Sequence, residues 1–595
     1  MRLLLRTTAV ALLALLIPVS ASGQTAASTD RDVFITDATI PMRDGVELHA
    51  RIWRPAPVDS VPAIISLTPY TTDDAHDRAR FFAEHGYAYV NVDTRGRGSS
   101  EGTFWPFSGD GVDGHDVVQW VAQQGWCDGR VGMRGGSYRG TVQWQTLGEQ
   151  PEALETIVPT AAAYPGWDFP NPNGIFLSYA ARWLAFTSGR ASQGDLFGDT
   201  DYWNEKFLTL YREHRPFSDL DEITGISSRI FDRWIEHPHL DSYWADMTPD
   251  TAAYRAMDAP ILTITGHFDG DQAGALRFYR RHVREGPEKG VAQHALLIGP
   301  WSHGGTRSPS PTLNELTFGE NSVVDVNQLH LDWFDSVFHG EERPDALDDR
   351  VTYYVMGANE WRAAPALSAV STDTTTWHLS SPKTDAHDVF HSGRLQSSPP
   401  TSSDTDTLVY DPTATPVDSA ALAEEDSYLD PGLAFDGEWT GGPRLVYHSP
   451  PLEEAVEVSG IPVLDAYIEL DVPDTDLAVA LYEIRADGTT IYLGDSALRA
   501  RHRAGVDTVA FPDPGRVYRY TFDRFNWFSR ELRAGSRLRV VLTPLNTPLA
   551  DKNYNSGGNT ITATDADART ATIQLHMSDV HPTALSVPVR RGQEE

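Results

Sequence analysis

Residues 131–147 read VGMRGGSYRGTVQWQTL, and they restrict the fold more than any other stretch of the sequence. A short apolar strand, Val131 to Met133, runs into Gly135-Gly-Ser-Tyr-Arg-Gly140, and residues that favour a helix follow. This order is typical of a nucleophile elbow, in which a serine sits on a strained turn with its hydroxyl directed away from the sheet. The common short form has glycine two residues after the serine, where this chain has Arg139. A Gly/Ser turn without chemistry therefore stays open at this point.

The rest of the first half alternates buried-strand runs with helical patterns, which predicts an α/β fold with a largely parallel sheet. Asp44-Gly45 predicts a hairpin turn between the first two strands. Residues 165–255 interrupt this alternation, because they are rich in Trp, Tyr and Phe and carry helical patterns at 175–187 and 203–214. We interpret them as a helical cap over a pocket, with a simple packing excursion as the alternative. The expected strands lie at 33–40, 46–53, 63–67, 88–92, 131–133, 260–264 and 295–298.

From about residue 345 the pattern changes to short alternating strands with Ser/Thr/Pro-rich connections, which predicts an all-β sandwich. At the other end, Arg2 and Arg6 precede an apolar run and small residues, as in a cleaved export signal. The run is shorter than the roughly 20 residues needed to span a bilayer. We therefore expect a signal peptide over 1–23, an α/β domain over 24–345 with its cap, and a β-sandwich over 346–595. The mature protein is expected to be secreted or periplasmic, without a membrane anchor.

The charge and the cysteine content limit the partners of the chain. It has 48 Lys and Arg against 83 Asp and Glu, a formal net charge of −35. Nucleic acids bind basic patches, so the acidic balance argues against a nucleic-acid partner. Cys127 is the only cysteine, which excludes an internal disulfide, and its neighbours have no metal-ligand spacing. We expect Cys127 to be a small apolar core residue.

Two later segments supply the partners that a nucleophilic serine needs. Serine is a poor nucleophile until a base takes its proton, and a third group must hold the base. In α/β-hydrolases these groups come in the order Ser, acid, His, each after a strand. Ser137, Asp269 and His303 stand in this order at the carboxyl ends of three predicted strands, where open α/β sheets place their sites. His267 is the nearest competitor for the base and fits a pocket-lining or packing role better.

The tetrahedral oxyanion of acyl transfer needs two preorganised hydrogen-bond donors. The backbone N–H of Tyr138, directly after the serine, is one candidate. The second is expected from the loop after an early strand, where Tyr70 follows Leu67-Thr-Pro. The Tyr70 phenol can donate there, although packing is the alternative role for a lone tyrosine.

Several motifs in the same order resemble the serine hydrolase family that includes bacterial cocaine esterase, α-amino acid ester hydrolases, glutaryl cephalosporin acylases and X-Pro dipeptidyl peptidases. The resemblance covers nearly the whole chain after the signal. It implies an α/β-hydrolase domain with a helical cap and a C-terminal jelly-roll β-sandwich. It also implies acyl transfer to water through an acyl-enzyme, without metal or cofactor, in a homo-oligomer. The motifs are Thr68–Tyr70, Asp93–Gly102, Trp126–Met133, Gly135–Gly140, Gly266–Asp269, Gly299–His303, Val355–Trp361, Asp474–Asp476, Leu498–Arg501 and Asn553–Gly557.

By the matching motifs, Ser137 would be the nucleophile, His303 the base and Asp269 its orienting acid. Tyr70 and the Tyr138 amide would form the oxyanion hole.

The motifs define the chemistry of the reaction more closely than they define the substrate. Amino acid ester hydrolases of this family hold the substrate's ammonium group with carboxylates two and three places after the acid. Here Asp271 fits the first place, Gln272 replaces the second, and Asp168 in the cap can supply another carboxylate. Converging acids favour a cationic substrate, whereas a single buried acid is more often structural.

We therefore expect a secreted serine esterase or amidase acting on small acyl esters or amides, with a preference for α-amino acyl groups left open. An X-Pro dipeptidyl peptidase is one alternative. The other is a carbohydrate-binding protein with an inactive hydrolase domain.

Overall fold

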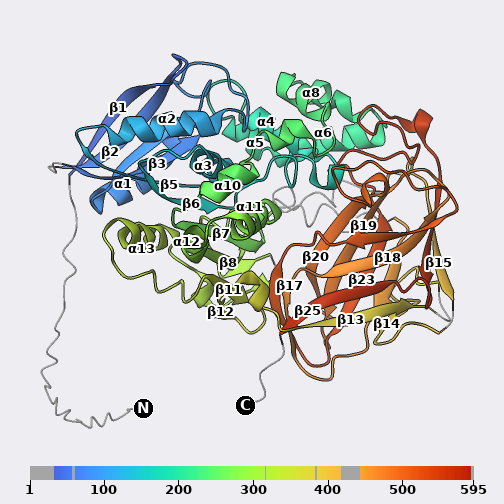
Figure 1. Cartoon of the computed structure of the whole chain (residues 1–595). Helices are drawn as coiled ribbons and strands as arrows, with labels where there is room; N and C mark the ends of the chain where they lie inside the picture. Colours follow the sequence, from blue (N-terminus) through green and yellow to red (C-terminus); the bar gives the residue numbers. More distant parts are fainter. Residues whose placement is uncertain are drawn as a thin grey trace, which may run out of the picture.

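The computed structural model describes residues 32–56, 60–314, 316–381, 385–401, 403–416 and 442–590 (Figure 1). The predicted export signal lies outside the described residues. Within the described ranges, no helix combines the length and the apolar character needed to cross a membrane.

The first domain is built on a mixed sheet to which the described chain contributes ten strands. Its seven central strands, from β4 to β11, run parallel, and β1, β2 and β12 pair antiparallel at the two edges. All seven predicted strands are present, and β6 was not predicted. The strands in sheet order are β1 (Val33–Pro41), β2 (Glu47–Pro55), β4 (Ala88–Asp93), β3 (Val61–Thr68), β5 (Cys127–Gly136), β6 (Leu154–Thr160), β7 (Ile261–Phe268), β8 (His294–Ser302), β11 (Val351–Val355) and β12 (Glu360–Ala364).

Helices cover both faces of this sheet because the central strands are apolar on both sides. On β3, Ala63 and Ile65 belong to one core and Ile64 to another, as alternate residues of a strand must. Helices α1 (His76–Glu84) and α13 (Val326–Phe338) pack over the Ile64 side. The opposite side carries α2, α3 and α11, where Trp144 of α3 stacks on Phe278 of α11 at 5.2 Å between ring centroids. These helices are α2 (Asp110–Ala122), α3 (Tyr138–Gly148) and α11 (Gln272–Glu285), with the short α12 (Glu288–Ala292) after α11.

The predicted cap is present between β6 and β7 as a group of mostly short helices (Figure 1). The helices expected at 175–187 and 203–214 are α4 and α6. Their apolar faces join the core that also holds α2 and α3, so the cap is packed onto the sheet domain as part of one hydrophobic core. The cap helices are α4 (Tyr179–Phe186), α5 (Gly194–Gly198), α6 (Thr200–Arg212), α7 (Leu220–Ile223), α8 (Arg229–Ile235), α9 (Ser242–Ala245) and α10 (Thr251–Ala256).

The C-terminal half is the predicted β-sandwich, and thirteen strands of the described residues form it. Burial alternates strictly along several strands, for example at Leu464, Ala466, Ile468 and Leu470 of β18, so one side of each strand faces a common core. The strands are β13 (Asp373–Ser380), β14 (Gly393–Gln396), β15 (Asp404–Tyr410), β16 (Leu445–His448), β17 (Val456–Gly460), β18 (Val463–Leu470), β19 (Asp476–Ile484), β20 (Thr490–Arg499), β21 (Val517–Phe522), β22 (Phe528–Leu532), β23 (Arg537–Pro544), β24 (Ala571–Met577) and β25 (Ala584–Arg590).

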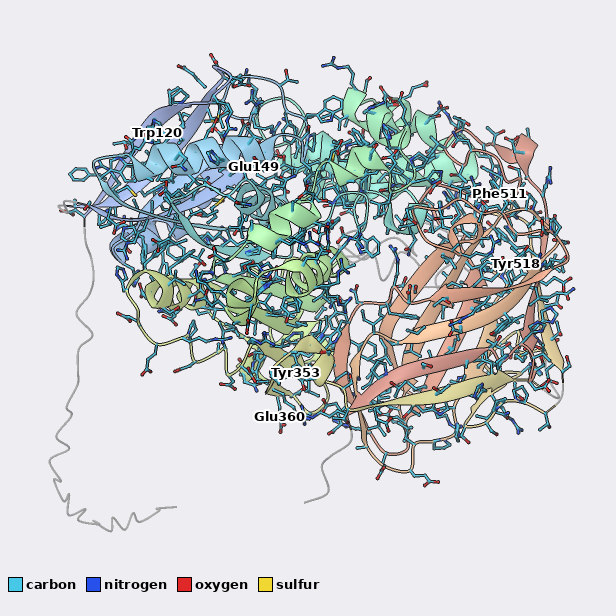
Figure 2. The ribbon with its side chains drawn as sticks, viewed as in Figure 1. Trp120, Glu149, Tyr353, Glu360, Phe511 and Tyr518 are labelled. Atoms are coloured by element: carbon cyan, nitrogen blue, oxygen red, sulfur yellow. The ribbon has the colours of Figure 1, made fainter. Side chains whose placement is uncertain are left out.

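The chain passes from the first sheet to the β-sandwich after β12, which lies later in the sequence than the predicted domain boundary at 345–346. Strands β11 and β12 follow residue 345 yet complete the first sheet, because β11 pairs parallel with β8. Figure 2 shows Tyr353 of β11 and Glu360 of β12 near the border with the sandwich. There Arg590 of β25 donates to the Tyr353 phenol at 2.7 Å. A fully buried five-residue strand has the same pattern in a parallel sheet and in a sandwich, so the sequence does not distinguish the two.

Candidate active site

Ser137 lies on the sharp turn between β5 and α3. Its backbone has φ 62° and ψ −130°, a conformation that costs energy for any residue with a Cβ. The turn is held by the Ser137 N–H, which donates to the Thr160 carbonyl of β6 at 2.9 Å, and by the Gly140 N–H, which donates to the Ser137 carbonyl at 2.7 Å. The strain is therefore fixed by the neighbouring strand, as a nucleophile elbow requires.

Gly140 stands three residues after Ser137, one place later than the glycine of the short nucleophile-elbow motif, and this position has a steric reason. A Cβ on Gly140 would lie 2.9 Å from both the Thr160 carbonyl oxygen and the Ala162 Cβ. The first turn of α3 thus runs directly against β6, and position 140 is where the backbones approach most closely. Position 139 faces elsewhere, since the Arg139 guanidinium lies over the Tyr70 ring at 5.6 Å from its centroid.

His303 and Asp269 form a buried hydrogen-bonded pair at the ends of β8 and β7. His303 Nδ1 lies 2.8 Å from Asp269 Oδ1. Because a carboxylate accepts, Nδ1–H is the donor, which leaves Nε2 as the basic nitrogen of the neutral ring. The Thr265 hydroxyl donates to Asp269 Oδ2 at 2.7 Å, and the Asp271 N–H donates to Oδ1 at 3.0 Å. These bonds fix the carboxylate, and with it the orientation of the imidazole.

Tyr70 reaches the serine from the loop after β3. Its phenol is hydrogen-bonded to the Ser137 hydroxyl, and the Trp183 indole N–H donates to it at 3.2 Å. Burial raises the pKa of Tyr70, so the phenol keeps its proton at neutral pH. The ring is held by stacking on Phe186 of the cap at 5.3 Å. Tyr70 is therefore a fixed, protonated donor beside the nucleophile.

Tyr138 is divided between two roles. Its phenol donates to Asp110 Oδ2 at 2.5 Å and accepts the Phe107 N–H at 3.1 Å, so the side chain is committed to the α2–α3 packing. Its backbone N–H begins α3, and the first N–H groups of a helix have no acceptor within the helix. The Tyr138 amide is consequently available beside Ser137, whereas its side chain is not.

A cavity of about 520 Å³ contains the serine and the histidine. Its aromatic side chains come from the cap and from the sheet domain, with Trp183 of the cap in contact with Phe107, Tyr138 and Phe169. The sequence indicated this wall only as a general richness in aromatic residues between 165 and 255, without identifying which of them would face the site. The lining residues are Phe107, Ser137, Tyr138, Ala163, Asp168, Phe169, Leu177, Tyr179, Trp183, Gly270, Asp271 and His303.

Asp168 and Asp271 both line this cavity, although one belongs to the cap and the other follows the triad acid by two residues. Burial is the main cause that raises the pKa of Asp271 to about 8; Asp168 and Asp269 act in the same direction, and His303 and Arg307 oppose them. Burial also raises the pKa of Asp168 well above its usual range. Asp168 accepts the Tyr164 N–H at 2.7 Å through Oδ1, while Oδ2 is buried without a hydrogen-bond partner among the described residues. Asp271 Oδ2 lies 3.7 Å from His303 Nδ1, so the triad histidine is its cationic neighbour when protonated.

The loop that carries Asp269 is held by the β-sandwich. The Asn526 amide donates to the Asp269 carbonyl at 3.2 Å. Gln272 exchanges two hydrogen bonds with the Trp527 backbone, at 2.7 and 2.6 Å. The second domain thus contributes to the geometry of the acid without lining the cavity. Gln272, three places after the triad acid, is used for this contact.

His267 is the one predicted site residue that the structure places elsewhere. It is buried against Trp527, with 5.6 Å between the stacked rings, and its Nε2 is 2.7 Å from the Tyr354 carbonyl. Burial lowers the pKa of His267 to about 4, so the ring is neutral. It is not among the residues that line the cavity, so of the two roles expected from the sequence, substrate-pocket lining and packing, these contacts support packing. Among the described residues, the side chains grouped closely enough to hold a metal ion are His387, Asp388 and His391 of the sandwich domain.

Comparison with known families matches both domains. The family model for X-Pro dipeptidyl-peptidase (S15 family) matches residues 44–305. The model for the X-Pro dipeptidyl-peptidase C-terminal non-catalytic domain matches residues 346–586. The second match begins just before β11, so it includes the two strands that complete the first sheet.

Individual relatives cover almost the whole chain. The cocaine esterase of Rhodococcus sp. (strain MB1 Bresler) is 27% identical over 585 residues, which span 93% of this chain and 98% of the relative. Among solved structures, an α-amino acid ester hydrolase superposes with a TM-score of 0.79 at 21% identity, covering 97% of this chain and 100% of that chain. An aminopeptidase from a marine sediment Thaumarchaeota archaeon gives a TM-score of 0.77 at 21% identity, covering 97% and 99%. At this identity the two structures support the fold alone.

Proposed function

We propose that this chain, which belongs to the S15 family of serine hydrolases, cleaves small acyl esters or amides through an acyl-enzyme on Ser137. The observation that carries the proposal is the convergence on one cavity of a strained serine, a carboxylate-held histidine and a protonated tyrosine. These groups come from the ends of β5, β8 and β3, and each is held by contacts that do not involve substrate. Such preorganisation is what acyl transfer requires.

In the first step, His303 Nε2 takes the Ser137 proton while Oγ attacks the substrate carbonyl carbon. Asp269 stabilises the imidazolium that forms, because it already accepts the Nδ1–H. The carbonyl oxygen becomes an oxyanion, which the Tyr70 phenol and the Tyr138 amide stabilise by hydrogen bonds. Collapse breaks the bond to the leaving group, and His303 returns the proton to the departing alcohol or amine.

In the second step, water replaces the leaving group. His303 takes a proton from the water, whose oxygen attacks the acyl-enzyme carbonyl, and the same two donors stabilise the second oxyanion. Collapse releases the carboxylic acid and returns the proton to Ser137 Oγ. The two steps together consume one water molecule and form one carboxylic acid and one alcohol or amine. Ser137, His303, Asp269 and the two oxyanion donors act in both steps.

We further propose that the preferred acyl group carries a free amine. Asp168 and Asp271 line the cavity together, and an ammonium group would supply positive charge beyond that of His303, which lies 3.7 Å from Asp271. Their raised pKa values fit this use, since binding a cation favours ionisation of a buried carboxyl group.

A dipeptidyl peptidase acting after proline is the second candidate, because the same two carboxyl groups would hold the N-terminal ammonium of a peptide and the matched family model carries that name. Membership of a serine hydrolase family counts against the carbohydrate-binding alternative.

We also propose that residues 1–23 direct export, as their charged, apolar and small-residue order supports.

Three substrates distinguish these activities: p-nitrophenyl butyrate, an α-amino acid methyl ester and an Ala-Pro anilide. We expect the amino ester to have the highest kcat/KM and Asp271→Asn to lower kcat/KM for the two amine-bearing substrates alone. Asp246→Asn, an exposed acid of the cap, is the matched control. Equal losses on all three substrates would reduce Asp271 to a structural acid. Undiminished hydrolysis of every substrate by Ser137→Ala would refute the proposed chemistry itself.

A further inference from the structure

A second cavity, of about 350 Å³ including open solvent, lies behind the nucleophile turn on the side of the sheet covered by α1 and α13. Four arginines and a histidine line it, from five separate segments. We call it the arginine cavity and define it by Arg78, Arg134, Arg139, Arg307 and His330. Gly135, Gly136 and Thr160 also contribute to its wall, so it adjoins the turn that bears Ser137.

Three of the four arginines have no carboxylate beside them. Arg78, Arg134 and Arg307 form no ion pair with any acidic side chain in the described ranges. Burial is the main cause that lowers the pKa of Arg134 to about 9, and the neighbouring charges of Arg78 and Arg139 act in the same direction. Burial and Arg139 likewise lower the pKa of Arg307. Several cations therefore face one another in a partly dehydrated space.

Buried arginines of the sandwich domain are paired with carboxylates. Arg499 pairs with both Asp476 and Asp551, at 2.8 and 2.9 Å. Arg530 pairs with Glu483 at 2.8 Å. A buried charge without a partner costs several kcal/mol, which is why such pairing is the rule. The arginine cavity differs from the sandwich domain in this respect, because Arg78, Arg134 and Arg307 lack such carboxylate partners.

His330 adds an independent observation. Its ring is 1% exposed, and its Nδ1 lies 2.9 Å from Arg134 Nε. Arginine can only donate, so Nδ1 must be the acceptor and the neutral ring carries its proton on Nε2. That Nε2–H has no acceptor among the described residues. The buried Thr160 hydroxyl of the same wall also has no partner there. The cavity thus presents donors and positive charge, and the acceptors of its wall are neutral hydroxyl and carbonyl oxygens, without a carboxylate among the lining residues.

We propose that the arginine cavity binds one small inorganic anion, with chloride as the representative ligand. An anion there accepts from the arginines and from His330 Nε2–H, and it removes the repulsion among the guanidinium groups. It would join the segment before the nucleophile, through Arg134, to the loop after the base, through Arg307. A Cβ on Gly136 would lie 3.5 Å from Arg307 Cδ, so that loop already rests on the turn. Anion binding would therefore stabilise the relative placement of Ser137 and His303.

The test compares chloride with gluconate, an organic anion much larger than chloride, at constant ionic strength. Constant ionic strength is essential, because a chain of net charge −35 gains stability from any salt through screening. We expect a saturable rise in Tm of about 2 °C with chloride, since a ligand that binds only the folded state stabilises it. Broadening of the ³⁵Cl NMR line, reversed by excess bromide, reports binding to the unmodified protein directly.

Two substitutions on one helix supply the matched pair. Arg78→Gln removes a cavity cation, and Arg80→Gln removes an exposed arginine two residues away that pairs with Glu84. We expect Arg78→Gln to weaken the chloride response at least fivefold and Arg80→Gln to leave it unchanged. If Arg78→Gln does not fold, His330→Phe replaces it, since that change removes the Nε2–H donor. Identical Tm curves in chloride and gluconate, or ³⁵Cl broadening equal in both variants, would overturn the proposal.

Discussion

Replacing Tyr70 by phenylalanine removes a single oxygen from the proposed oxyanion hole. The aromatic ring is retained, and with it the stacking on Phe186 and the contact with the Arg139 guanidinium. What is lost is the phenol that contacts the Ser137 hydroxyl and accepts the Trp183 indole N–H. The substitution therefore tests the donor with little change of shape.

The expected size of the effect follows from the number of donors. The Tyr138 amide remains, so one of two donors is removed. Loss of one oxyanion donor costs about 2.7–4 kcal/mol in transition-state stabilisation, or about 10²- to 10³-fold in kcat. The ground-state carbonyl binds the donor weakly, so KM should change little. The Trp183 N–H is left without its acceptor, which should lower the free energy of unfolding by about 1–3 kcal/mol.

The assay is steady-state hydrolysis of p-nitrophenyl butyrate, with Tm measured on the same samples. Tyr243→Phe is the matched control, because Tyr243 accepts the Trp105 indole N–H at the same 3.2 Å and does not line the catalytic cavity. It should lose comparable stability and keep its kcat. If Tyr70→Phe keeps kcat within tenfold of the wild type, Tyr70 is a packing residue and the oxyanion hole must be sought elsewhere.

Three further outcomes follow from the same geometry. Asp269→Asn should lower kcat by about 10⁴-fold by steady-state kinetics, since an amide favours the wrong tautomer of His303, and a loss below tenfold would contradict the assignment. Burial raises the pKa of Asp271 to about 8 from its usual 3.8, so wild-type stability falls as pH rises between these values. The Tm advantage of Asp271→Asn should accordingly widen from pH 4 to pH 8, and a constant gap would refute the burial argument. Gly140→Ala should lower the free energy of unfolding in urea by about 1–3 kcal/mol, because its Cβ would meet β6, whereas Gly125→Ala has open space and should not.

Much of the fold follows from local pattern, and its exceptions have identifiable causes. Strands such as β3 and β8 contain the apolar runs Ala63–Ile65 and Ala295–Ile298 and are buried on both faces, as a doubly covered sheet requires. Strand β6 is not predicted because LETIVPT mixes more polar residues with its apolar ones. Strands β11 and β12 follow the predicted boundary and yet complete the first sheet, because β11 pairs with β8 and β12 pairs with β11, which local pattern does not indicate.

The sequence predicts those site residues that stand at the ends of strands. It does not predict the residues that come together only because distant segments fold against one another. Ser137, Asp269 and His303 each follow a predicted strand, so parallel pairing alone places them at one edge. Asp168 meets Asp271 only because the cap folds back over that edge. The arginine cavity gave no signal, since its members are spread over α1, β5, α3, α13 and a loop. The sequence leaves pocket lining and packing open for His267 because its neighbour Trp527 lies in the other domain.

Mass spectrometry after treatment with a fluorophosphonate tests the covalent step most directly. Only a serine whose proton is removed by a positioned base reacts at a useful rate with this reagent. We predict one adduct per chain, located on the peptide that contains Ser137, and its disappearance in Ser137→Ala. Folded protein that stays unmodified, or that carries its adduct on a different serine, would contradict the account.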